Sequence, residues 1–271
     1  MTIDVESCRL IPTESHPGAE NMALDEIAAR RAADTGTATA RVYCWEPSTL
    51  SLGYTQQPKT VAWKWCREHG IDVTRRSTGG GGILHESTGD VAYSIVAPSD
   101  AVPSDLLDAY ELLCTPVIDA FASLGIEVDF ASEEQPPIYE PSCYLRGINP
   151  AHDLVVAGTP ERKISGNAQY RQRDAVVQHG SLKYAVDPDR LLNCFTTEDI
   201  DSDQVRERVA TVEELGVTDL TDMIDALEGS LVAFLGAEPG NWTEAERAAS
   251  KTLTTEKFEA EEWIRHREAP A

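Results

Sequence analysis

The chain has 271 residues and a formal net charge of −23 at pH 7, because 46 acidic side chains outnumber 23 basic ones. So acidic a protein is a poor candidate for binding nucleic acid through its phosphates. Its length suits one large domain or two small ones, with a real hydrophobic core. We attribute the acidity to a solvated surface adapted to high salt, where charge repulsion is screened, and therefore expect a halophilic source.

The sequence predicts a cytoplasmic protein. The first ten residues carry no basic n-region and no apolar h-region, so no signal peptide is expected. No apolar run approaches the roughly 18 residues that span a membrane. The cysteines are scattered and form no C-x-x-C pair; they are Cys8, Cys44, Cys66, Cys114, Cys143 and Cys194. Such spacing is typical of reduced thiols in a cytosol rather than of a disulfide framework or a zinc site.

The first half of the chain alternates strand-like and helical segments. We expect strands at 8–12, 40–45, 49–54, 71–76 and 126–130, and a pair of strands at 83–85 and 90–96. Helices are expected at 19–34, 59–70 and 104–125. Asn21 and Ser104 are the expected caps of the first and third helices, and Pro116 is expected to kink or split the third.

The second half begins with an aperiodic segment, 131–152, which is rich in proline and polar residues. Loops of that length inside compact domains are usually functional, and we expect this one to be an active-site loop. Strands follow within 153–186, and the chain from Asp187 onward is mostly helical, including 243–264. This order predicts a single α+β domain, residues 1–271, built on a mixed or antiparallel sheet.

Four consecutive glycines stand in the segment RRSTGGGGILHE, residues 75–86. They match neither a P-loop nor a dinucleotide-binding loop, because a strand-like segment follows them instead of a helix. One interpretation is a glycine-rich hairpin turn. The other is a bare backbone against which a ligand lies, with Arg75 and Arg76 hydrogen-bonding its carboxylate or phosphate.

Other candidates each have a plainer alternative. Lys163 is a compact cation that suits a carboxylate or an acyl-phosphate, or else a solvated lysine on an edge strand. His179 precedes Gly180, where the backbone could approach another group, or is a core histidine at a strand end. Asp153 could hold a metal ion or cap a turn. Cys143 is either a functional thiol with electropositive neighbours or an incidental one.

Together these stretches resemble the catalytic domain of the lipoate–protein ligase and octanoyltransferase family, relatives of biotin–protein ligase. The similarity covers nearly the whole chain, and the family's motifs appear in order as NMALDE (21–26), RVYCWEPSTLSLGYTQ (41–56), RRSTGGGGILH (75–85), DLVVAG (153–158), KISGNAQYRQ (163–172), QHGSL (178–182) and TTEKFEAEEWI (254–264). The resemblance implies a mixed sheet flanked by helices and a tunnel for a medium-chain acyl group.

The resemblance also implies roles for individual residues. Lys163 would be catalytic and would contact the acyl carbonyl, while Arg76 and His85 would hold the acid end of the substrate. The full substrate-binding set would be Arg76, Gly79, Gly80, Gly81, His85, Ser165, Gly166, Ala168, His179 and Gly180. In a ligase, Arg76, Asp153 and Lys163 would bind the nucleotide, and Asp153 would bind Mg²⁺.

Two mechanisms occur in the resembled family, and we expect the first. A ligase uses ATP to activate lipoate or octanoate as an acyl-adenylate, which the acceptor lysine of a lipoyl domain attacks. An octanoyltransferase instead takes the acyl group from acyl carrier protein, or from a lipoyl domain, onto a cysteine without ATP; Cys143 would be that nucleophile. The implied partners are lipoyl domains of 2-oxoacid dehydrogenases or glycine cleavage proteins, and a ligase would need a separate accessory domain. No tightly bound cofactor is expected.

Overall fold

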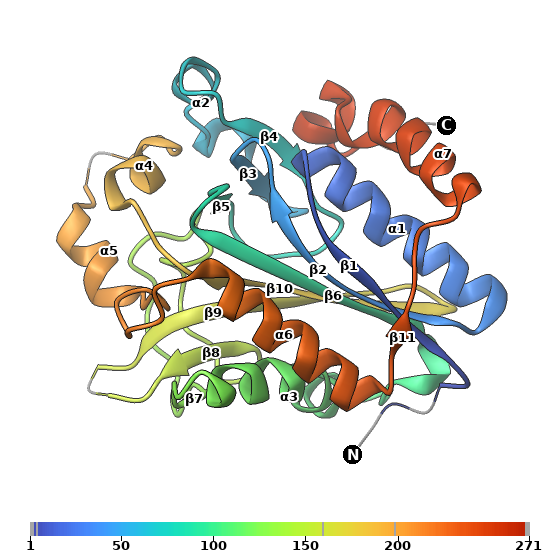
Figure 1. The fold of residues 1–271 in the computed structure, drawn as a ribbon. Helices are drawn as coiled ribbons and strands as arrows, with labels where there is room; N and C mark the ends of the chain where they lie inside the picture. The colour runs from blue at the N-terminus through green and yellow to red at the C-terminus, as the bar shows by residue number, and fades with distance from the viewer. Residues whose placement is uncertain (1–2, 4, 159, 198, 269–271) are drawn as a thin grey trace.

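The structure is a computed structural model that describes residues 3, 5–158, 160–197 and 199–268. Most of its strands form one eight-stranded sheet in the order β11-β1-β2-β6-β10-β9-β8-β7 (Figure 1). These strands are β1 (Cys8–His16), β2 (Ala38–Trp45), β6 (Asp90–Pro98), β7 (Val128–Phe130), β8 (Asp153–Val156), β9 (Arg162–Arg171), β10 (Ala175–Lys183) and β11 (Glu238–Pro239). Strand β1 pairs in parallel with β2 and β11, and the other neighbours pair antiparallel. The expected α+β class with a mixed sheet is confirmed.

A smaller sheet carries the glycine run. Its order is β4-β3-β5, with β3 at Thr49–Leu52, β4 at Asp72–Arg75 and β5 at Ile83–His85. The prediction that segments 83–85 and 90–96 pair with each other is wrong, because β5 pairs with β3 while β6 lies between β2 and β10 of the large sheet. The chain therefore passes from one sheet to the other directly after the glycine run.

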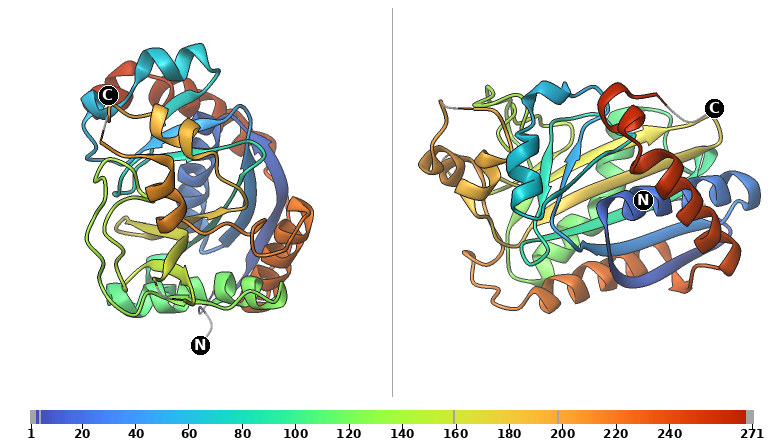
Figure 2. Two further views of the ribbon diagram at one scale, coloured as in Figure 1. Left: turned by 90° about the vertical axis from the view of Figure 1, so that its left-hand side faces the viewer. Right: turned by 90° about the horizontal axis from the view of Figure 1, so that it is seen from above.

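Helices cover both faces of the large sheet (Figures 1 and 2). They are α1 (Gly18–Thr35), α2 (Trp63–Glu68), α3 (Leu106–Ser123), α4 (Pro188–Asn193), α5 (Ser202–Arg208), α6 (Leu220–Leu235) and α7 (Glu244–Leu253), with short 3-10 turns η1 (Pro58–Thr60) and η2 (Ser99–Ala101). In β2, Ala40 and Val42 pack in the cluster that includes α3 and α6, whereas Tyr43 and Trp45 pack in the cluster that includes α1. This alternation follows from the two-residue period of a strand and explains why β2 is buried throughout.

Two expected helix caps are wrong. Asn21 lies inside α1 instead of capping it, because its amide donates to the carbonyls of His16 (3.2 Å) and Cys44 (3.0 Å) and so ties the helix to the sheet. Asp105, not Ser104, caps α3 by accepting from the amides of its first turn. Of the two effects expected of Pro116, a split is not seen, because the same helix continues from Leu106 to Ser123 with buried side chains on both sides of the proline.

The C-terminal segment is α-helical as far as Leu253 and then forms two π-helical turns, η3 (Thr254–Phe258) and η4 (Glu262–His266). These turns hold the end of β4. Arg75 Nε donates to the carbonyl of Ile264 (2.8 Å), and Trp263 Nε1 donates to the carbonyl of Arg75 (2.7 Å). The C-terminal turns thus contact the chain directly before the glycine run. Within the described residues, no helix is both long and apolar enough to cross a membrane.

Candidate active site

A cavity of about 590 Å³ lies between the two sheets, the glycine run and the 131–152 loop. Most candidate residues line it: Arg76, Gly79, Gly80, His85, Cys143, Asp153, Lys163, Gly166, Ala168, His179 and Gly180. Gly81 and Ser165 do not line it. Segments from most of the chain length therefore converge on one site, as the motif order predicts.

Several lining residues were not singled out from the sequence, notably Tyr43, Trp45, Tyr110, His152, Asn167 and Ser181. For two of them the sequence held a signal, namely a polar residue inside a segment expected to be a strand. Asn167 and Ser181 are polar and buried in strands of the sheet interior, where an uncharged polar side chain requires a partner. Asn167 has two, since its amide donates to the carbonyl of His152 (3.0 Å) and its Oδ1 accepts from the Tyr93 hydroxyl (2.8 Å).

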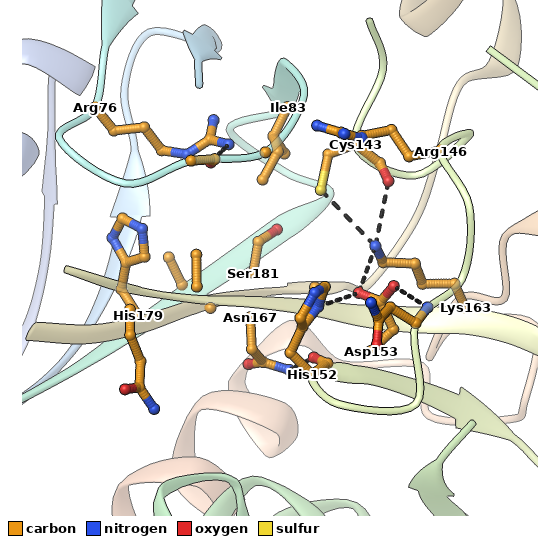
Figure 3. A pocket seen from close by; sticks show the side chains of 18 of the residues that line it. Arg76, Ile83, Cys143, Arg146, His152, Asp153, Lys163, Asn167, His179 and Ser181 are labelled. Carbon is orange, nitrogen blue, oxygen red and sulfur yellow. Dashed lines mark hydrogen bonds and ion pairs between the residues drawn. The ribbon is translucent and has the colours of Figure 1, made fainter. Parts of the chain in front are cut away.

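Cys143, Lys163 and Asp153 form the polar centre of the cavity (Figure 3). Lys163 Nζ lies 3.8 Å from Cys143 Sγ, 3.2 Å from the Cys143 carbonyl oxygen and 2.7 Å from Asp153 Oδ1. Cys143 is half-buried, whereas the other five cysteines are buried. The arrangement places one ammonium group beside the one thiol that a ligand can reach.

Both members of the Lys163–Asp153 pair are charged. Burial alone would lower the pKa of Lys163, but the neighbouring Cys143 and Asp153 outweigh burial and raise it above its ordinary value. Burial would raise the pKa of Asp153, but the positive charge of Lys163 and the His152 contact lower it to about 2. Asp153 thus compensates the buried ammonium, which remains available to stabilise a thiolate or an oxyanion.

The glycine run holds Cys143 in place. Cys143 N donates to the Gly82 carbonyl (2.9 Å), and Gly82 N donates to the Pro141 carbonyl (2.7 Å), so the run and the 131–152 loop pair like two short strands. A Cβ atom at Gly81 would lie 2.7 Å from Cys143 N and 2.9 Å from the Pro141 oxygen. The backbone must therefore be bare at Gly81, because another segment of backbone lies against it.

Gly81→Ala is expected to lower kcat/KM by roughly tenfold to a hundredfold, because the new methyl group displaces the backbone that carries the thiol. Steady-state activity measurements on both proteins would quantify the loss. Gly79→Ala is the matched comparison, since a Cβ there meets no atom within 4 Å. An equal loss in both variants would contradict the docking role of Gly81.

Both arginines before the glycines bind the protein's own carbonyls, which differs from the anion-binding role that the sequence suggests. Arg76 uses all five N–H groups, donating to the carbonyls of Gly79, Gly81 and Ser51 and to the hydroxyls of Thr78 and Ser51. Arg75 Nη1 donates to three backbone carbonyls between residues 53 and 56. The two cations therefore shape the glycine run.

His85 differs from its expected role in the same way. Its Nε2 lies 2.8 Å from Ser51 Oγ, its Nδ1 lies 3.4 Å from Asp90, and its ring stacks on Trp45 with centroids 3.7 Å apart. Burial lowers the pKa of His85 to about 4 despite the Asp90 carboxylate. His85 is therefore a neutral, stacked part of the cavity wall and carries no positive charge toward an acid group.

His179 and Gly180 lie on the opposite wall, on β10. His179 Nε2 lies 2.7 Å from Thr78 Oγ1 and its Nδ1 lies 3.5 Å from Asp25, so the imidazole links the residues after β4 to α1. A Cβ at Gly180 would lie 2.3 Å from Asn167 Oδ1. The close approach expected at Gly180 is therefore to a neighbouring side chain.

The residues around Asp153 do not fit a magnesium site. Asp153 Oδ1 faces Lys163 Nζ and His152 Nδ1 (3.3 Å), and Oδ2 accepts from the backbone amide of Asn149 (2.9 Å). Nowhere in the described part of the chain do three His, Cys, Asp or Glu side chains group as metal ligands. Because Mg²⁺ favours carboxylate oxygens and water, an adjacent ammonium disfavours it here.

The fold and this site define an enzyme of the lipoate ligase and transferase class. Residues 17–232 match the profile of the lipoyl protein ligase A/B catalytic domain. The chain belongs to that family.

Relatives and solved structures agree with this assignment. The chain is 30% identical to octanoyltransferase LipM of Halalkalibacterium halodurans and 32% identical to that of Staphylococcus aureus, covering 96% of this chain and 99% and 98% of those proteins. Its fold is similar to lipoate–protein ligase A bound with ATP (TM-score 0.79, 23% identity, 96% and 98% of the two chains). It is also similar to the bipartite lipoate protein ligase of Thermoplasma acidophilum (TM-score 0.77, 22% identity, 96% of both chains).

Proposed function

We propose that the protein is an octanoyltransferase that moves an octanoyl group from acyl carrier protein to the acceptor lysine of a lipoyl domain through a thioester on Cys143. The observation that carries the proposal is the 3.8 Å approach of Lys163 Nζ to Cys143 Sγ inside the cavity. Relatives at 30% identity or more that bear the name octanoyltransferase support it. Cysteine-dependent transfer is therefore preferred to the ATP-dependent ligase reaction that the sequence favours.

The chemistry follows from the charges. The Cys143 thiolate, stabilised by the Lys163 ammonium, adds to the thioester carbonyl of the donor and forms a new carbon–sulfur bond. The bond to the donor sulfur breaks, and the donor thiolate leaves and takes up the proton that the Cys143 thiol released. The acceptor amine then attacks the acyl-enzyme, forms the amide, loses one proton and returns the Cys143 thiolate.

Arg76 and Asp153, two of the residues expected to bind a nucleotide, already bind other groups of the protein, which also favours transfer over adenylation. The Arg76 guanidinium is saturated by protein acceptors, and Asp153 is committed to Lys163, His152 and a backbone amide. An acyl-adenylate needs cationic groups free to meet its phosphate. Lys163 is paired with Asp153 and meets that need only in part.

The test supplies purified protein with octanoyl-acyl carrier protein and a lipoyl domain, without ATP, at low and high ionic strength. We expect octanoyl-lipoyl domain to appear in the intact-mass spectrum, and adding ATP with Mg²⁺ should not raise the rate. The comparison reaction contains free octanoate or lipoate, ATP, Mg²⁺ and the same acceptor. Product in the comparison reaction alone would overturn the proposal in favour of the ligase.

A further inference from the structure

Tyr144 follows the candidate nucleophile and is 1% exposed, although the 131–152 loop that carries both forms neither a helix nor a named strand. Its hydroxyl donates to the Ser181 carbonyl (2.8 Å) on β10. Burial raises the pKa of Tyr144 well above its ordinary value, so the hydroxyl keeps its proton and remains a donor. This bond ties the residue next to Cys143 to the centre of the large sheet.

The ring of Tyr144 lies near two buried ammonium groups. Lys163 Nζ is 5.4 Å from the ring centroid and Lys183 Nζ is 4.9 Å from it, both within the range of a cation–π interaction. Such contacts gain strength where water is excluded, and both lysines are nearly inaccessible, at 2% and 1%. The ring therefore contributes to the surroundings of the Lys163 ammonium that faces Cys143.

Lys183, the second ammonium group beside the ring, belongs to a buried hydrogen-bond network. Lys183 Nζ pairs with Asp90 Oδ2 (2.5 Å) and donates to the Leu84 carbonyl (2.6 Å), and Ser181 Oγ donates to Asp90 Oδ1 (2.7 Å). Lys183 and Ser181 lie on β10, Asp90 begins β6, and Leu84 belongs to β5. Tyr144 thus connects the reactive loop to a cluster in which both sheets take part.

We propose that Tyr144 is a positioning residue for the acyl transfer proposed above, on which this inference rests. Its hydroxyl fixes the loop that carries Cys143, and its ring fixes the Lys163 ammonium beside the sulfur. The two functions are separable by substitution. Tyr144→Phe removes the tether and keeps the ring, whereas Tyr144→Leu removes both.

The experiment measures acyl-transfer kinetics and the alkylation of Cys143 by iodoacetamide, followed by peptide mass spectrometry across a pH series. We expect Tyr144→Phe to lower kcat roughly tenfold with little change in KM and with an unchanged pH profile of alkylation. Tyr144→Leu should lower kcat further and move that profile to higher pH, because the ammonium is no longer held beside the sulfur. Should Tyr144→Leu not fold, Tyr144→Met fills more of the same volume and replaces it.

Tyr184→Phe is the matched control. It removes a phenol hydroxyl from the residue after β10, in the core cluster beneath α3 and α6, and should leave kcat and alkylation unchanged. Wild-type kcat in Tyr144→Phe would overturn the tether, and an unmoved alkylation profile in the leucine variant would overturn the role of the ring. Alkylation reports the position of Cys143 without any acyl donor, so failure of this inference is distinct from failure of the proposed function.

Discussion

Replacing Cys143 with serine is expected to abolish octanoyl transfer, lowering kcat/KM by at least ~10³-fold. A serine hydroxyl at this position would stay protonated beside the Lys163 ammonium, whereas a thiol ionises readily next to a cation. In wild-type protein incubated with octanoyl-acyl carrier protein alone, peptide mass spectrometry should find the octanoyl group on Cys143. The serine variant should carry none.

Cys8→Ser is the control for the loss of a thiol. Cys8 is buried at the start of β1, and its thiol donates to the carbonyl of Arg9 (3.9 Å). That variant should keep wild-type transfer. Activity in Cys143→Ser that depends on ATP would instead assign the reaction to an acyl-adenylate and remove Cys143 from the chemistry.

Lys163→Met is expected to lower kcat/KM by ~10²–10³-fold, because the methionine side chain fills a similar volume without the charge that faces the reacting sulfur. The same change leaves Asp153 buried without its cation, and removing one partner of a buried ion pair destabilises a protein by about 3–5 kcal/mol. The two effects are separated by the double variant Lys163→Met/Asp153→Asn. Chemical denaturation should show most of the stability restored in the double variant, while transfer remains lost.

Acid titration adds a second measure of this pair. The pKa of Asp153 is lowered from 3.8 to about 2, so its ion pair stabilises the fold above pH 3.8 and that contribution is lost as the pH falls toward 2, where the folded carboxylate also takes up a proton. Without Lys163 the carboxylate loses the charge that lowers its pKa. The difference in unfolding free energy between wild type and Lys163→Met, measured by chemical denaturation at a series of pH values, should therefore be largest above pH 3.8 and shrink as the pH falls toward 2. Full activity in Lys163→Met would exclude Lys163 from the mechanism.

The sequence predicts the architecture well, because strand and helix patterns are local. It also indicates that another group lies close against the backbone of the four glycines. What approaches Gly81, however, is the loop around Cys143, some sixty residues later, and no local pattern identifies that partner. The glycines serve the protein's own backbone as well as the cavity.

The roles of the charged residues were harder to predict, since a cation's partner depends on which segments the fold brings to it. Two adjacent arginines suggest an anion, yet Arg75 and Arg76 bind carbonyls supplied by β3, the glycine run and the C-terminal turns. Ser181 and Lys183 show no distinctive spacing from Tyr144 in the sequence. Their cluster exists only because β10 runs beneath the loop.

The family profile ends at residue 232, but the structure places a support of the catalytic pocket beyond that limit. The carbonyl of Ile264 accepts from Arg75, and the Trp263 indole donates back to the same residue, directly before the turn that leads to the glycines. The last residue that the family profile matches is therefore not the last residue that supports the cavity. A fragment trimmed to residues 17–232 would keep Cys143 and Lys163 but lose strand β1 and the C-terminal turns that hold Arg75.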